Sequence, residues 1–175
     1  MNNADKKNPE IDVLGMWMVE DLMRALNFDI NKVEAALLKS NTGTEEDKAS
    51  EKQWYERIIS KMKEEGILQQ GHLQMCKDAV ARLTARHKAL LKDSKNKDYR
   101  NLYYEALPAI VDFRSRQQMP NEPHSEHHSE IESWLEMLYG VKLLKLQGQT
   151  ISEPTQQAAS MVEKLYDLLR NQTEE

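Results

Sequence analysis

Apolar residues recur at helical spacing along most of the chain, and the stretch from Ile11 to Leu26 has the densest pattern. A helix that is apolar over most of its circumference is typically buried on several sides. Asn8 followed by Pro9 is a typical helix start, with a capping side chain and a proline in the first turn. We therefore expect a central helix over Pro9–Leu26. At about 100° per residue its apolar stripe consists of Ile11, Leu14, Met18, Leu22 and Ala25, widened by Val19, Met23 and Leu26.

The same spacing, together with capping residues, predicts six more helices. The sixth, Glu130–Gln147, is the second strongly apolar one, and we expect it to lie beside the first at the centre of the fold. Pro108 falls inside the fifth helix and should bend it, because proline removes a backbone hydrogen bond. We find no strand pattern and predict an all-α bundle of about seven helices. The six further helices should begin near Asp29, Thr44, His72, Asp98, Glu130 and Ser152.

The length of 175 residues favours a single domain. We expect a flexible lead over residues 1–8, one all-helical domain over residues 9–171 and a flexible C-terminus over residues 172–175. With only 6 Gly and 5 Pro the chain has few turn signals, which agrees with long helices and short connections.

The net charge of −5 argues against binding nucleic acid, because neutralising phosphates requires a surplus of Lys and Arg. The single cysteine, Cys76, excludes an intramolecular disulfide and fits a reducing compartment. The start of the chain lacks the apolar segment of a secretory signal. No apolar run approaches the ~20 residues of a membrane-spanning helix. We therefore predict a cytoplasmic protein that binds neither nucleic acid nor membranes.

One edge of the first helix combines an indole, carboxylates and a guanidinium, and it is the first candidate site. Its polar members are Glu20, Asp21 and Arg24, and they lie on the same edge as Trp17. Glu20 and Arg24 have the i, i+4 spacing of an ordinary helix ion pair. If the edge is half buried, its charges need partners from another helix, because an unpaired buried charge is costly. The edge is then either a structural polar network or the lining of a pocket near Trp54, Tyr55 or His87.

The fourth helix has a regular three-and-four alternation of apolar residues with one histidine, His87, among them. This pattern is typical of a bundle seam. We expect His87 to be a core histidine, hydrogen-bonded to a tyrosine or carboxylate of a neighbouring helix. Cys76 lies on the same seam, so we interpret it as a buried thiol and not as a nucleophile. His72 is expected to cap the helix or to pack on Trp54 or Tyr55.

A histidine-rich segment precedes the sixth helix and is the third candidate. His124 and His128 are spaced i, i+4, as in HExxH zinc sites, and His127 and Glu130 could add ligands. The flanking prolines and serines instead favour a solvated loop, and no Cys or clear fourth ligand lies nearby. We therefore expect no physiological metal and no cofactor. The sequence contains no nucleophile elbow, phosphate-binding glycine loop or dinucleotide fingerprint.

Three pieces of the chain resemble a known family when taken in order. They are MWMVEDLMRALNFD, then WYERIISKMKEEG with GHL after it, then EIESWLEMLYGVKLLKLQ before TISEPT. Together they resemble a bacterial all-helical family known as domain of unknown function 4924. The resemblance implies a small cytoplasmic helical domain, and it implies no activity, cofactor or catalytic residue.

These observations leave three hypotheses of function open, with an enzyme less favoured than an interaction module. The leading hypothesis is a non-enzymatic interaction module that forms a homodimer or binds an unknown protein partner. Aromatic positions on the third and seventh helices look exposed and could form a symmetric interface. The alternative is a small-molecule-binding or enzymatic bundle with its pocket along Trp17, Glu20, Asp21 and Arg24. A weaker alternative is metal binding by the histidine-rich segment.

Overall fold

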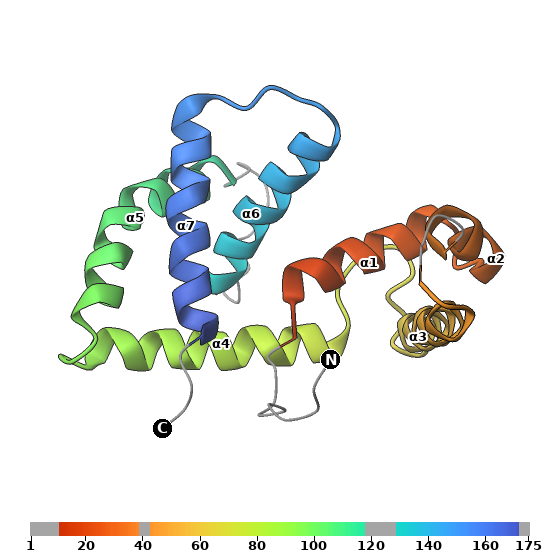
Figure 1. Cartoon of the computed structure of the whole chain (residues 1–175). Helices are drawn as coiled ribbons and strands as arrows, with labels where there is room; N and C mark the ends of the chain where they lie inside the picture. The colour runs from red at the N-terminus through yellow and green to blue at the C-terminus, as the bar shows by residue number, and fades with distance from the viewer. Residues whose placement is uncertain (1–10, 39–42, 118–128, 172–175) are drawn as a thin grey trace. The chain divides into compact units, whose positions relative to one another are not determined.

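A computed structural model describes residues 11–38, 43–117 and 129–171 of the chain. These residues form seven α-helices and one π-helical turn, and they contain no strand, so the prediction of an all-α fold is confirmed (Figure 1). The elements in order are α1 (Val13–Ala25), α2 (Ile30–Val33), η1 (Glu34–Leu38), α3 (Glu45–Glu64), α4 (Gln74–Lys92), α5 (Lys97–Gln117), α6 (Glu130–Leu146) and α7 (Glu153–Asn171).

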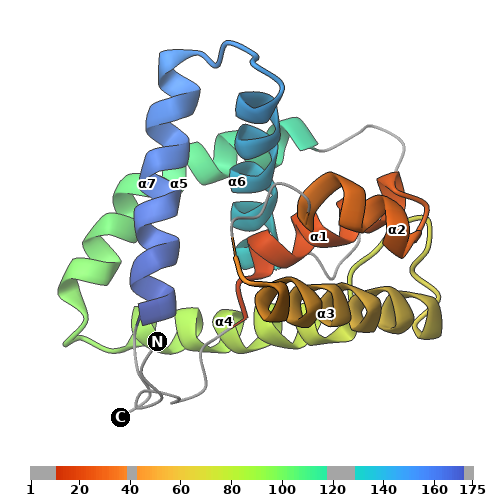
Figure 2. The same ribbon diagram turned by 45° about the vertical axis from the view of Figure 1, so that its right-hand side comes forward.

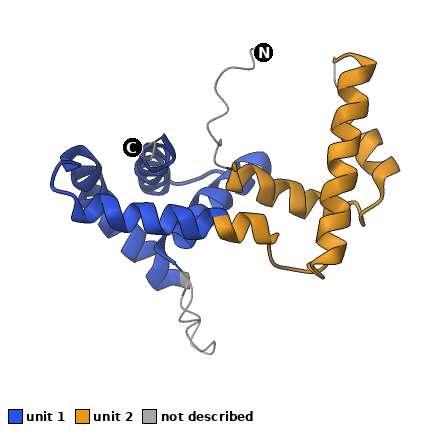
Figure 3. Ribbon diagram, turned by 90° about the horizontal axis from the view of Figure 1, so that it is seen from below, with its two compact units in different colours: residues 1–10, 79–175 blue, residues 11–78 orange. Residues whose placement is uncertain are grey.

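The chain forms two compact units, which Figure 3 shows in different colours. Unit 2 covers residues 11–78, and the described part of unit 1 begins at residue 79. Helix α4 contributes its first turns to unit 2 and the rest to unit 1. A single domain over residues 9–171 stays a prediction. A centre shared by the first and sixth helices also stays a prediction, because α1 and α6 belong to different units.

Helix α1 begins at Val13, and residues 11 and 12 precede it, so the predicted start at Pro9 is wrong. Asp12 is its N-cap, with extended backbone angles, and Ile11 also precedes the helix. The predicted buried stripe also differs from the observed one. Ala25 is exposed and Leu14 is half-buried. The buried positions of α1 are Val13, Met16, Trp17, Glu20 and Met23, so the edge that carries Glu20 is the interior one.

A tight corner joins α1 to α2. Asn27 and Phe28 both have positive φ, 54° and 56°, so the chain leaves the helical conformation at these two residues. The Phe28 N–H donates to the carbonyl of Met23 at 2.8 Å and so covers one of the free carbonyls at the end of α1. Asp29 then caps α2, and its carboxylate accepts from the Asn31 N–H at 2.9 Å.

Helix α3 has capping groups at both ends. Thr44 and Asp47 form a capping box, in which the side-chain oxygen of each residue accepts from the backbone N–H of the other. At the other end Gly66 has φ of 70°, which a residue with a side chain adopts only at a cost. The Ile67 N–H returns to the carbonyl of Met62 at 3.0 Å, which completes a Schellman motif.

Unit 1 is built from α5, α6 and α7, which contact one another pairwise, together with most of α4. Helix α6 is buried on nearly all sides over its first three turns, including Ile131, Trp134 and Leu138. Its N-cap Ser129 forms a capping box with Glu132. Helix α5 contains Pro108, and Figure 2 shows that this helix changes direction along its length, as the proline predicts.

The aromatic positions of α3 and α7 are not the exposed surface that the sequence suggested. Tyr55 of α3 and Tyr166 of α7 are both buried in the core, and Trp54 is half-buried. Their rings therefore stabilise the fold of each unit. A symmetric interface, if one forms, must use other residues.

Candidate functional site

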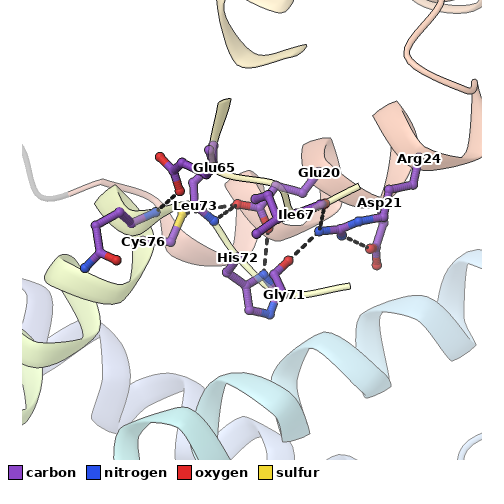
Figure 4. A network of polar contacts seen from close by, with 10 residues as sticks. Glu20, Asp21, Arg24, Glu65, Ile67, Gly71, His72, Leu73 and Cys76 are labelled. Carbon is purple, nitrogen blue, oxygen red and sulfur yellow. Dashed lines mark hydrogen bonds and ion pairs between the residues drawn. The ribbon is translucent and has the colours of Figure 1, made fainter. Parts of the chain in front are cut away.

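The centre of the candidate site in unit 2 is the carboxylate of Glu20, which has no exposed surface (Figure 4). One oxygen, Oε1, accepts from the backbone N–H of Leu73 at 3.0 Å and from the thiol of Cys76 at 3.6 Å. The other oxygen, Oε2, lies 2.6 Å from Nδ1 of His72. A buried carboxylate is tolerated only when hydrogen bonds replace its lost water, and this one has a partner on each oxygen.

The imidazole of His72, which contacts this carboxylate, stacks on the indole of Trp17. Their ring centroids are 4.2 Å apart and the two planes differ by 13°. The His72 side chain is 37% exposed, while the Trp17 ring beneath it is buried. His72 was expected to cap a helix or to pack on Trp54 or Tyr55, and the structure stacks it on Trp17. The imidazole therefore presents Nδ1 to the buried carboxylate.

Arg24 reaches from the last turn of α1 to the backbone between α3 and α4. Its Nη2 donates to the carbonyls of Ile67, at 3.2 Å, and of Gly71. Its Nη1 forms an ion pair with Asp21 at 2.8 Å. Gly71 has φ of 91°, in the region that favours glycine, and this turns its carbonyl into a position where the guanidinium can bind it. Arg24 thus fixes the connection at two points.

Glu20 and Arg24 together hold the start of α4 against α1. The first N–H groups of a helix lack partners within the helix and attract negative charge. Two carboxylates supply that charge here: Glu20 accepts from Leu73, and Glu65 accepts from the Gln74 N–H at 2.7 Å. We call the set Trp17, Glu20, Arg24, His72 and Cys76 the α1–α4 clasp.

The thiol in the clasp is not poised for nucleophilic chemistry. Burial, and then the negative charge of Glu20, raise the pKa of the Cys76 thiol far above its usual range. The reactive form of cysteine is the thiolate, which this environment disfavours. Cys76 therefore serves as a small buried donor, as the sequence suggested.

The other candidate residues of the sequence form contacts of their own. Trp54 and Tyr55 form an edge-to-face pair on α3, with ring centroids 5.0 Å apart. His87 lies in unit 1 and so belongs to a different compact unit from Glu20. The structure thus brings Trp17, Glu20, Asp21, Arg24 and His72 together within unit 2.

His87 lies in an aromatic cluster formed by α4, α5 and α6. Its Nδ1 is 2.6 Å from the hydroxyl of Tyr99, and its ring meets those of Tyr103 and Trp134 edge-on at 5.1 and 4.9 Å. Only 3% of His87 is exposed. Burial, and then the nearby charge of Lys88, lower the pKa of His87 to about 4. The expected core histidine bonded to a tyrosine is therefore present.

The histidine-rich segment cannot be compared with the prediction made for it, since His124, His127 and His128 lie outside the described residues. Glu130 is described, and it accepts from the hydroxyl of Tyr103 at 3.4 Å. Among the residues that the structure describes, no group of three or more His, Cys, Asp or Glu side chains is arranged to hold a metal ion.

A feature that the sequence reading missed is an apolar stripe on the outer face of α5. Tyr104 and Val111 are 62% and 56% exposed, Pro108 between them is exposed, and Leu107 is half-buried. These four residues have the spacing i, i+3, i+4 and i+7, which places them on one side of a helix. The helix's buried residues, Tyr99, Tyr103, Ala106 and Ile110, lie on another side. We call Tyr104, Leu107, Pro108 and Val111 the α5 stripe.

Comparisons with known proteins identify a family and nothing more specific. No match was found among curated proteins or among solved structures. No helix in the described ranges is both long and apolar enough to cross a lipid bilayer. The family described as "Domain of unknown function (DUF4924)" matches residues 2–175, which is nearly the whole sequence. The chain therefore belongs to this DUF4924 family.

Proposed function

We propose that this protein is a non-enzymatic interaction module that forms a homodimer through the α5 stripe. The observation that carries the proposal is the exposure of Tyr104 and Val111, 62% and 56%, on one side of a helix that already buries another side in the core of its unit. Burying a large apolar side chain contributes about 1.5–3 kcal/mol, so leaving two of them in water has a cost that a partner would remove. Two-fold homodimers are the commonest assemblies of soluble proteins.

A cytoplasmic location is part of this proposal. It is supported by the use of cysteine: the one cysteine, Cys76, is a buried free thiol that donates to Glu20. Such a thiol persists in a reducing compartment.

The alternative of a ligand pocket along the polar edge of α1 has less support from the geometry. Glu20 and Arg24 would have to offer hydrogen bonds to a ligand. Both oxygens of Glu20 and both terminal nitrogens of Arg24 already bind groups of their own unit. A ligand that used these groups would have to displace those partners. The pocket alternative predicts that Arg24→Ala abolishes ligand binding and leaves folding intact.

The dimer should be lost when a charge is placed in the stripe. We expect the wild-type protein to show a concentration-dependent dimer in sedimentation equilibrium, and Val111→Glu to weaken dimerisation at least ten-fold, because the buried carboxylate would lose its water. Leu146→Glu is the matched control, since Leu146 is 66% exposed on α6 and receives the same charge away from the stripe. A wild-type protein that stays monomeric at high micromolar concentration contradicts the proposal, as does an equal effect of the two variants.

A further inference from the structure

We infer that the two copies pair their α5 helices in parallel, with the acidic flank of one α5 stripe facing the basic flank of the other. This inference rests on the proposed function, since it specifies how the second copy binds. It follows from the charges beside the stripe, which differ in sign on its two sides.

The acidic flank carries Glu105 and Asp112, which are seven residues apart and both exposed. At about 100° per residue they lie roughly 100° to one side of the stripe. Asp112 is already paired with Arg116 at 2.8 Å, so Glu105 is the charge on this flank that a second copy can use.

The basic flank carries Arg100 and Arg114, which lie roughly 50° to the other side of the stripe by the same geometry. Arg114 is exposed and Arg100 is half-buried. The α5 stripe is therefore bordered by negative charge on one side and positive charge on the other. A surface of this kind is complementary to a second copy of itself, provided that the copies are oriented so that unlike flanks meet.

The symmetry of the pair decides which flanks meet. If two α5 helices met antiparallel about a two-fold axis, each flank would face its own copy, and like charges would be brought together. If they met in parallel, each flank would face the opposite flank of the partner, as e and g positions do in parallel coiled coils. In that register Arg100 lies near Glu105 of the second copy, five residues further along, and the symmetry repeats the pair.

The size of the stripe limits the strength of the dimer. Stable complexes bury about 800 Å² per partner, which a surface of four main side chains approaches only with the help of its flanks. We therefore expect a dissociation constant in the micromolar range, and charge reversal on the flanks should produce a measurable change in it.

Disulfide trapping tests the orientation directly. A disulfide requires Cα atoms about 4.4–6.8 Å apart. In the parallel pair, position 111 lies beside its own copy, so Val111→Cys alone should form a covalent dimer under mild oxidation. In an antiparallel pair, position 111 lies opposite position 104, so a mixture of Val111→Cys with Tyr104→Cys should form the mixed dimer instead. The wild-type protein, whose only thiol is the buried Cys76, is the control for background.

Charge reversal tests the same inference by the sign of its effect. In the parallel pair Glu105→Arg places the new arginine beside Arg100 of the second copy, and the two-fold symmetry creates this repulsive pair two times. The change should weaken the dimer about five-fold at low salt. In an antiparallel pair the same change would place an arginine near Asp112 of the second copy and strengthen the dimer. Glu56→Arg, an exposed reversal on α3, is the control.

The outcomes separate this inference from the proposed function. A dimer that Val111→Glu abolishes, but that is trapped only in the mixed pair or strengthened by Glu105→Arg, overturns the parallel orientation and leaves the proposed function standing. A wild-type chain that never dimerises overturns both. Self-trapping of Val111→Cys together with weakening by Glu105→Arg supports the parallel pair.

Discussion

Replacing Glu20 by leucine should lower the free energy of unfolding by roughly 3 kcal/mol, because a buried donor left without its acceptor costs about 1–3 kcal/mol and this change removes the acceptor of several groups. The change keeps the volume of the side chain but removes both acceptor oxygens. The Leu73 N–H would then be buried without a partner, and His72 would lose the carboxylate 2.6 Å from its Nδ1. Urea unfolding followed by circular dichroism measures the effect.

A graded second variant shows whether the hydrogen bonds cause this loss. Glu20→Gln keeps one oxygen for the Leu73 N–H, and its amide can donate to a neutral Nδ1 of His72. We expect it to cost about 1–2 kcal/mol, less than the leucine variant. Asp21→Leu is the matched control: Asp21 is the next residue, it is exposed, and its ion pair with Arg24 belongs to the class worth less than about 1 kcal/mol. Equal losses for Glu20→Leu and Asp21→Leu would show that the α1–α4 clasp does not stabilise the fold.

The clasp also explains why the sequence assigned the wrong buried face to α1. Hydrophobic periodicity counts Glu20 as polar and therefore turns its edge toward solvent. A carboxylate that meets two donors on the start of α4 reverses that assignment. Half of the partners of Glu20 and Arg24 are backbone groups, those of Ile67, Gly71 and Leu73, and residue types do not reveal where a backbone N–H or carbonyl will point. The helical spacing therefore predicted which side chains of α1 lie together, but it could not predict the groups that they bind.

The same limit applies to α5, where the sequence pattern is ambiguous in another way. This helix carries apolar residues on two sides, and periodicity alone does not show that the second side stays exposed. In the structure α5 contacts α6 and α7. Its residues Tyr103 and Ile110 are buried, while Tyr104 and Val111 lie in solvent. In α4, by contrast, the seam of single apolar positions allows one interpretation only. The burial of His87 beside a tyrosine could therefore be predicted.

Acidification should destabilise the protein by about 3 kcal/mol between pH 7 and pH 4 through His87 alone. The pKa of His87 is lowered to about 4 in the folded protein, mainly by burial, from about 6.5 in the unfolded chain. Between these values the unfolded state binds more protons than the folded state, so stability falls as the pH falls. The contribution is fully present above pH 6.5 and is lost by about pH 4. Urea unfolding at a series of pH values measures it.

The hydrogen bond to Tyr99 indicates which variant isolates this effect. Burial, and then the charge of Glu130, raise the pKa of Tyr99, so its hydroxyl keeps its proton and can donate it to Nδ1 of a neutral His87, 2.6 Å away. Protonating His87 would set two donors against each other at 2.6 Å in a site lined by Tyr103 and Trp134. In His87→Asn the amide oxygen can replace Nδ1 as acceptor, but the side chain does not titrate. That variant should be less stable than the wild type at pH 7. Between pH 7 and pH 4, however, its free energy of unfolding should decrease by about 3 kcal/mol less than that of the wild type. Parallel pH profiles for the two proteins would show that the acid sensitivity comes from the carboxylates, and that His87 can be protonated where it lies.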